Sequence, residues 1–252
     1  MTDPTDASLD FLTLADGRQI ARRLRCGSRA PTVLFLPGYA SDMDGTKAVA
    51  LDRWVEEHGH GCVRFDYSGT GSSPGTFEEG TLDRWLEEAL AVSDQVEGPL
   101  ILVGSSMGGW LALHLAIARP ERVVGLVGIA TAPDFTDWGF DAEDRAVLER
   151  AGRLERPNPY GGNAGVTTIG FWRSGQTMLL LGGEIAIECP VRLVHGDCDQ
   201  EVPVAIAERT LGALRSSDVQ LWVVKGGGHR MSAPSEIATI LRAVAELMEL
   251  AR

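Results

Sequence analysis

The stretch Ile101–Leu113, ILVGSSMGGWLAL, joins an apolar run to an apolar pattern of helical spacing through a segment rich in serine and glycine. The run before the turn is typical of a buried strand, and the pattern after it is typical of a helix that ends at Arg119-Pro120. The stretch therefore predicts a strand, a sharp turn and a helix. Two serines, Ser105 and Ser106, lie in that turn.

The spacing of the glycines distinguishes the two serines. Gly104 and Gly108 flank Ser106 in the pattern G-x-S-x-G, whereas a frame centred on Ser105 would need glycine where Val103 stands. A serine on such a turn exposes its hydroxyl at the edge of a sheet, and the two glycines leave space where a Cβ would collide with neighbouring backbone. The helix that follows favours an oxygen anion beside the serine through its dipole and the free N–H of Met107. Ser106 is therefore the candidate nucleophile.

The composition indicates a globular chain with one sizeable core. The 252 residues are 44% hydrophobic and 23% charged, and 23 basic against 35 acidic residues give a net charge of −12. No cluster of Lys or Arg is long enough to follow a phosphate backbone, so no nucleic-acid partner is expected. No apolar segment of membrane-spanning length and no targeting signal in Met1–Asp10 are recognisable, so we expect no stable membrane insertion and a cytoplasmic location.

The four cysteines are scattered without CxxC spacing, and the chain is too large to need disulfide staples. We expect them to be reduced, buried small hydrophobes; they are Cys26, Cys62, Cys189 and Cys198.

Strand-like and helix-like segments alternate along the chain after an opening hairpin. The hairpin strands, Leu9–Leu14 and Gln19–Leu24, flank the turn dipeptide Asp16-Gly17. Six further apolar runs are expected to be strands buried on both faces: Val33–Leu36, Cys62–Phe65, Leu100–Val103, Val123–Ile129, Val191–Val194 and Val219–Val224. Alternation of this kind predicts an α/β fold with a mostly parallel eight-stranded sheet and helices on both faces.

Helices are expected between these strands. They cover Gly45–His58, Leu82–Val96, the residues after Pro203 and the C-terminal stretch through Met248. The segment 134–189 breaks the alternation with a charged helix over Asp141–Arg153 and a Pro- and Gly-rich loop. We interpret it as a lid inserted into a core formed by residues 1–133 and 190–252.

Five histidines compete for the role of base. His58 and His60 close a helix, His114 lies on an apolar helix face and His195 ends a strand, whereas His229 follows the last strand on a glycine-rich loop. His58-x-His60 has metal-ligand spacing, but no third ligand lies nearby in the sequence. His229 is the candidate base.

An acid that orients the base is expected in the loop between Val191–Val194 and Pro203, because the chain order is then serine, acid, histidine. Asp197 and Asp199 are both eligible there. Glu201 lies close to a helix start, where its charge is expected to interact with the end of the helix. Asp134 is the remaining alternative for the acid.

With these residues in place, the chain resembles the α/β-hydrolases, and within them the mitochondrial palmitoyl-protein thioesterase and acyl-glucuronide esterase subfamily. The resemblance covers nearly the whole chain. It lies in the segments Phe35–Tyr39, Gly45–Ala48, Arg64–Gly69, Leu102–Ser106, Gly108–Trp110, Ala116–Pro120 and His229–Met231.

The resemblance implies hydrolysis of acyl thioesters or carboxylic esters through a covalent acyl-serine, with a small molecule or an acylated protein as substrate. It implies Ser106 as nucleophile, Asp199 in the D-x-x-V-P position as acid, His229 as base, and the N–H groups of Tyr39 and Met107 as the oxyanion hole. No metal or organic cofactor is needed for this chemistry. A non-catalytic small-molecule-binding scaffold, and an acyltransferase or peptidase using the same triad, are the alternatives.

The chain departs from the subfamily in the lid, which matches poorly, and in the transit segment of the animal proteins, which is not recognisable here. The lid is rich in aromatic residues, including Phe135, Phe140 and Tyr160. We hypothesise that Trp138, Phe171, Trp172 and Met178 wall an acyl pocket above Ser106; ordinary packing of the lid on the sheet is the alternative interpretation.

Overall fold

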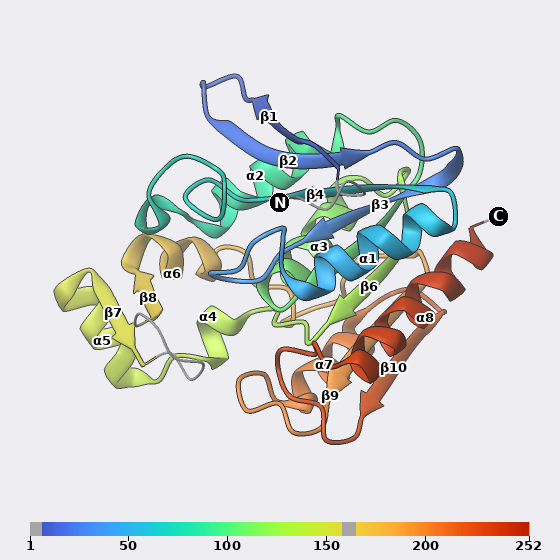
Figure 1. Cartoon of the computed structure of the whole chain (residues 1–252). Coiled ribbons are helices and arrows are strands. Elements are labelled where there is room, and N and C mark those ends of the chain that lie inside the picture. The colour runs from blue at the N-terminus through green and yellow to red at the C-terminus, as the bar shows by residue number, and fades with distance from the viewer. Residues whose placement is uncertain (1–6, 158–164, 252) are drawn as a thin grey trace.

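The computed structural model describes residues 7–157 and 165–251, and within these ranges eight strands form one twisted sheet (Figure 1). The spatial order is β1-β2-β4-β3-β5-β6-β9-β10. The strands are β1 Leu9–Thr13, β2 Gln19–Arg25, β3 Arg29–Leu36, β4 His60–Phe65, β5 Leu100–Ser105, β6 Val123–Ile129, β9 Val191–Gly196 and β10 Val219–Val224. The pairs β1–β2 and β2–β4 are antiparallel and the others are parallel. The expected mostly parallel eight-stranded sheet is confirmed.

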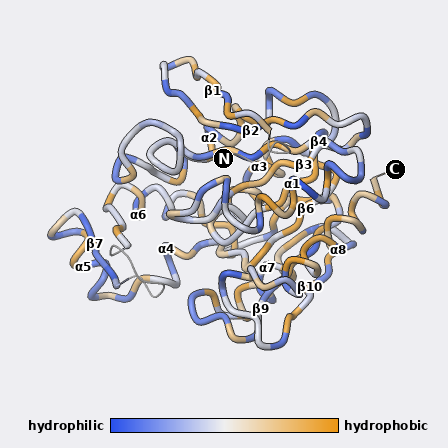
Figure 2. Tube along the Cα trace, viewed as in Figure 1, coloured by the Kyte–Doolittle hydropathy of each residue, from blue (hydrophilic) through white to orange (hydrophobic). Residues whose placement is uncertain are grey.

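Helices cover both faces of this sheet, because the central strands bury side chains on both sides. One apolar cluster joins α1 (Thr46–Glu57) and α8 (Pro234–Leu250) to Val33, Phe35 and their neighbours. The other joins α2 (Leu82–Ser93) and α3 (Met107–Ala118) to Leu34, Leu36 and the alternate residues of β5. Successive residues of one strand thus face opposite clusters, as the period of two requires. Apolar residues accordingly concentrate in the central strands (Figure 2).

Parallel pairing brings the carboxyl ends of the central strands to one edge of the sheet. Tyr39 follows β3, Ser106 follows β5, Asp199 follows β9 and His229 follows β10. Open α/β sheets bind their ligands at this edge, where the loops after the strands converge. The topology therefore places residues that are up to 190 positions apart in the chain at the same edge.

Residues 134–189, which lie between β6 and β9, form an insert. It contains α4 (Phe135–Trp138), α5 (Ala142–Ala151), β7 (Arg153–Arg156), β8 (Gly165–Thr168) and α6 (Ile169–Gln176), and it projects to the left of the sheet in Figure 1. The helix expected over Asp141–Arg153 is α5, whose N-cap Asp141 accepts from the Asp144 N–H. Tyr160 and most of the expected Pro- and Gly-rich loop lie outside the described residues.

The insert is tied to the core at both of its ends. Asp134, at its start, accepts the N–H groups of Leu180 (2.8 Å) and Leu181 (2.7 Å), near its end. The Met178 carbonyl accepts from Trp110 Nε1 (3.1 Å) and lies 2.9 Å from His114 Nε2, both on α3. These contacts fix the neck of the insert on the helix that follows Ser106.

Two expectations about the fold are wrong, and one pair of strands was not foreseen. The strand β10 is not buried on both faces, because it lies at the edge of the sheet and leaves Val223 50% exposed. Cys26 and Cys198 are exposed rather than buried, although all four cysteines are free as expected. The antiparallel pair β7–β8 was not expected, because its short strands are largely exposed and carry no apolar run.

The remaining helix, α7 (Val204–Ala213), follows Pro203 as predicted, and a short 3-10 turn covers Phe77–Glu79. Among the helices of the described residues, none is both long enough and apolar enough to span a membrane.

Candidate active site

Ser106 lies on a strained turn between β5 and α3. Its φ of 54° and ψ of −119° belong to a region that residues other than glycine rarely adopt, and such strain is typical of a nucleophile elbow. Ser106 is partly exposed, whereas Ser105 is only 7% exposed. The turn therefore presents the hydroxyl of Ser106, and not that of Ser105, at the sheet edge.

Close backbone packing explains the glycines around this serine. A Cβ on Gly104 would lie 2.4 Å from the Gly108 carbonyl oxygen, and a Cβ on Gly108 would lie 2.1 Å from the Leu36 carbonyl oxygen. Both distances are far inside van der Waals contact, so no larger residue fits without backbone movement. The glycine spacing allows the first turn of α3 to pack directly on the end of β3.

His229 connects Ser106 to Asp199. Its Nε2 lies 3.0 Å from Ser106 Oγ, and its Nδ1 lies 2.8 Å from Asp199 Oδ2. Because an ionised carboxylate only accepts, the Nδ1 nitrogen carries the proton, and the Nε2 of the neutral imidazole is left to accept from the serine hydroxyl. The structure thus brings together the three residues expected to form a triad.

The Asp199 carboxylate is fully buried and surrounded by donors. Its Oδ1 accepts the N–H groups of Glu201 and Val202, each at 2.9 Å. Burial would raise the pKa of Asp199, but hydrogen bonds from His195, His229 and the Val202 amide outweigh it and hold the pKa well below 3.8. The carboxylate therefore stays ionised beside His229 at neutral pH.

Backbone hydrogen bonds between the loops after β9 and β10 set the position of the acid relative to the base. The Asp197 N–H donates to the Val224 carbonyl at 3.1 Å, and the Cys198 N–H donates to the Gly227 carbonyl at 2.9 Å. These bonds continue the β9–β10 pairing beyond the strands, so Asp199 lies one residue and His229 two residues past the last bonded pair, Cys198–Gly227. The separation of their side chains is therefore fixed by the sheet itself.

The other acids considered from the sequence occupy different places. Asp197 is exposed and its Oδ1 accepts the Gly226 N–H, while Asp134 accepts the two amides at the neck of the insert. Glu201 lies beside the base on its other side, with Oε2 4.0 Å from His229 Nε2. Of these carboxylates, Asp199 is the one that hydrogen-bonds His229 Nδ1.

The remaining histidines also have separate contacts. His58 Nδ1 lies 2.7 Å from the Trp54 carbonyl and His60 Nδ1 lies 3.0 Å from the Pro31 carbonyl. His195 was interpreted only as a strand end, yet its Nε2 lies 3.4 Å from Asp199 Oδ2. No pattern in the sequence indicated this contact, because the residues between the end of β9 and Asp199 form an irregular turn. In the described part of the chain no three His, Cys, Asp or Glu residues are grouped so as to hold a metal ion.

The two expected oxyanion donors belong to segments that adjoin Ser106. Met107 is the first residue of α3, so its N–H has no partner within the helix. The loop that carries Tyr39 packs against the elbow, because a Cβ on Gly38 would lie 3.4 Å from Ser106 Cβ. The positive end of the α3 dipole points at the same place.

The side chain of Tyr39 links this loop to the insert. Its hydroxyl donates to the Val166 carbonyl in β8 at 2.6 Å, and burial raises the pKa of Tyr39, so the hydroxyl stays protonated. Its ring lies against Phe77 and Phe171, with centroid distances of 5.1 and 4.8 Å. This contact was not foreseen, because nothing local in the sequence relates position 39 to position 166.

The residues expected to wall an acyl pocket fall into two groups. Phe171 and Met178 are buried, 1% and 8% exposed, and belong to the core cluster shared with α3. Trp138 and Trp172 are half-buried, with their indole N–H groups on the carbonyls of Pro133 and Thr136. Trp138 also packs against the cluster that contains Val202, and so adjoins the loop of Asp199.

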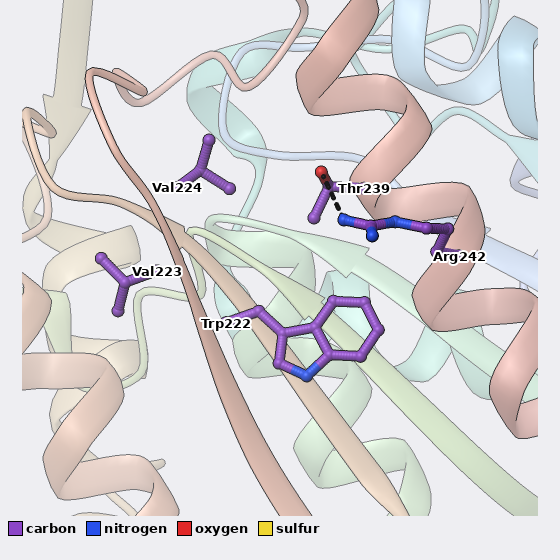
Figure 3. Close-up of a pocket in the computed structure, with 5 residues that line it drawn as sticks. All are labelled: Trp222, Val223, Val224, Thr239 and Arg242. Atoms are coloured by element: carbon purple, nitrogen blue, oxygen red, sulfur yellow. Dashed lines mark hydrogen bonds between the residues drawn. The ribbon is translucent and has the colours of Figure 1, made fainter.

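A surface depression lies elsewhere, between β10 and α8 (Figure 3). The Arg242 guanidinium lies 5.8 Å from the centroid of the Trp222 ring and donates to Thr239 Oγ1 at 3.3 Å. The lining residues are Trp222, Val223, Val224, Thr239 and Arg242. None of them is a candidate catalytic residue.

Comparisons with known proteins agree with this fold and this arrangement of side chains. Residues 33–240 match the model of the Alpha/beta hydrolase family, and the chain belongs to that family. Palmitoyl-protein thioesterase ABHD10, mitochondrial, is 40% identical in Pongo abelii over 96% of this chain and 80% of that protein, and 39% identical in Homo sapiens. The protein is therefore a hydrolase.

Solved structures also match nearly the whole of this chain. Alpha/beta hydrolase domain-containing protein 10 from mouse has a TM-score of 0.91 and 38% identity, covering 98% of this chain and 100% of that one. A putative hydrolase from Agrobacterium vitis S4 has a TM-score of 0.89 and 37% identity, covering 95% and 99%. The expectation of a cytoplasmic location is contradicted, because the named relatives are mitochondrial proteins.

Proposed function

We propose that this hydrolase cleaves acyl thioesters or carboxylic esters through a covalent acyl–Ser106 intermediate. The observation that carries the proposal is the hydrogen-bonded series Ser106–His229–Asp199 at the carboxyl edge of the sheet, with distances of 3.0 and 2.8 Å. Relatives named palmitoyl-protein thioesterase support the thioester class and an acylated protein or small molecule as substrate.

In the first half of the reaction, His229 Nε2 takes the proton of Ser106 as its oxygen attacks the acyl carbon. Asp199 holds the imidazole in the Nδ1-protonated tautomer and stabilises the imidazolium that forms. The N–H groups of Tyr39 and Met107 stabilise the oxyanion, and His229 then protonates the leaving thiol or alcohol. Water repeats the sequence on the acyl-serine and releases the carboxylic acid.

The acyl chain is proposed to lie on the apolar surface where the insert meets the acid loop. Phe135, Trp138 and Leu181 of the insert pack there against Val202 and Ile206. Because Val202 also donates its amide to Asp199, this surface adjoins the triad. Phe135 and Leu181 also pack against the core cluster that contains the buried side chains of Phe171 and Met178.

A substrate panel tests this function, with acyl thioesters, oxygen esters and amides whose acyl length and leaving group vary independently. We expect kcat/KM on thioesters to rise from acetyl to at least octanoyl, by about fourfold for each methylene buried at roughly 0.8 kcal/mol, and then to level or fall. Ser106→Ala is the control and should abolish turnover. Hydrolysis of amides alone, transfer to an added acceptor in place of hydrolysis, or binding without turnover would contradict the proposal.

A further inference from the structure

His195 lies near the same carboxylate oxygen of the candidate acid as His229. Its Nε2 lies 3.4 Å from Asp199 Oδ2 and 2.8 Å from the Val202 carbonyl oxygen. The imidazole is 1% exposed, in contrast to the side chain of His229, which is 14% exposed. Two imidazoles therefore converge on one carboxylate oxygen, one from the interior and one from the substrate side.

The contact with Val202 defines which nitrogen of His195 carries the proton. A carbonyl oxygen only accepts, so Nε2 is the donor to Val202, and the same protonated nitrogen lies 3.4 Å from Asp199 Oδ2. Val202 in turn donates its own amide to Asp199 Oδ1 at 2.9 Å. His195, Val202 and Asp199 thus form a closed ring of contacts, and the ring is anchored in β9, because His195 is a residue of that strand.

We propose that His195 is a positioning residue of the hydrolase, whose Nε2–H holds the Asp199 carboxylate in the orientation that accepts from His229 Nδ1. The proposal rests on the proposed function, because it gives Asp199 the role of the acid. His195 acts through Asp199 and does not contact the substrate.

The electrostatics of the acid agree with this role. Burial opposes ionisation of Asp199, and the hydrogen bond from His195 is one of the contacts that nevertheless hold the pKa of Asp199 below its ordinary value. Without that donor, the carboxylate would keep its two backbone donors on Oδ1 and His229 alone on Oδ2. The position of Oδ2 would then depend on the His229 side chain alone, which is itself the group that the carboxylate has to orient.

Two amide substitutions form a matched pair for the test. The amide nitrogen of His195→Gln reaches about as far as Nε2 of histidine, whereas that of His195→Asn is too short to reach Asp199. We expect kcat to fall about 10- to 100-fold in His195→Asn with KM within about threefold of wild type, and Gln to restore most of the loss. Equal kcat in all three proteins, or equal losses in Asn and Gln, would overturn the proposal.

A double-substitution cycle separates positioning from general stability. In an Asp199→Asn background, His195→Asn should cost less than threefold further in kcat, because the orientation that it supports is already lost. An undiminished effect there would show that His195 acts independently of Asp199 and would overturn the proposal. If Ser106→Ala retained turnover, the proposed function itself would fail. That outcome is distinct from a failure of the positioning proposal, which is measured in the His195 variants.

Nitrogen-15 NMR of the wild-type protein provides a measurement that does not depend on whether the variants fold. We expect the His195 imidazole to be protonated at Nε2, with a proton that exchanges slowly with solvent. A ring protonated only at Nδ1 could donate neither to Val202 nor to Asp199 and would overturn the proposal.

Discussion

Replacing Asp199 by asparagine removes the charge of the candidate acid while keeping its shape. The orientation of the new amide follows from its neighbours. At Oδ1, two backbone N–H groups at 2.9 Å cannot become acceptors, so the amide oxygen is held there. The amide NH₂ then takes the place of Oδ2 and faces His229 Nδ1, which lies 2.8 Å from that position.

The consequence is a change of tautomer in the base. His229 can accept from the NH₂ group only by moving its proton from Nδ1 to Nε2, the nitrogen 3.0 Å from Ser106 Oγ. With Nε2 protonated, the imidazole has no lone pair to take the serine proton. The same substitution in a Ser-His-Asp protease costs about 10⁴-fold in kcat, which corresponds to about 5.5 kcal/mol at about 1.4 kcal/mol for each factor of ten. We expect a loss of that size here.

Asp197→Asn is the matched control, because it makes the same change two residues away in the same loop. Asp197 is exposed and contacts the Gly226 amide rather than His229, so we expect kcat within about threefold of wild type. Steady-state hydrolysis of an acyl thioester measures both variants, and thermal unfolding checks that both are folded. If Asp199→Asn kept more than a tenth of the wild-type kcat, or if Asp197→Asn lost as much, the tautomer reasoning would be refuted.

Three further predictions concern the nucleophile, the link to the insert and the half-buried Lys47. A fluorophosphonate probe should label Ser106 and not Ser105, as read by peptide mass mapping; label that persists in Ser106→Ala would contradict the assignment. Tyr39→Phe removes the hydroxyl that donates to Val166 but keeps the ring. It should lower the free energy of unfolding, measured by urea denaturation, by about 1 kcal/mol. An unchanged urea midpoint would show that this hydrogen bond does not stabilise the fold. Burial lowers the pKa of Lys47 from 10.5 to about 8, so between these pH values the unfolded chain binds more protons than the folded one. The contribution of Lys47 to the free energy of unfolding therefore rises with pH in this range. Lys47→Met should remove this rise, and an equal dependence of the free energy of unfolding on pH in both proteins would contradict the prediction.

Much of the fold follows from local pattern in the sequence. The central strands are recognisable because they are buried on both faces and therefore read as continuous apolar runs, such as Leu100–Val103. The edge strand β10 shows the limit of this signal: its run is apolar except for Gln220, yet Val223 is half exposed. Whether an apolar run is central or at an edge depends on its partners, which lie far away in the chain.

The position of Ser106 was determined by the sequence alone. The pattern that marks it is local, because Gly104 and Gly108 lie two residues before and after Ser106, although the backbone that excludes a Cβ at Gly108 belongs to Leu36 of β3. His229 was also expected from its place after the last strand. Both inferences depend on chain order and nearest neighbours, which the sequence states directly.

From the residues alone both Asp197 and Asp199 were eligible as the acid, and the family resemblance implied Asp199. The tertiary structure decided which carboxylate contacts the base and what supports it. Asp197 and Asp199 lie in one loop, and the turn after β9 directs one toward Gly226 and the other toward His229. The approach of His195 to the acid, and the tie between Tyr39 and β8, likewise depend on side-chain directions and on contacts across the fold. Side-chain direction in an irregular loop follows from long-range hydrogen bonds rather than from residue type, so neither composition nor periodicity determines it.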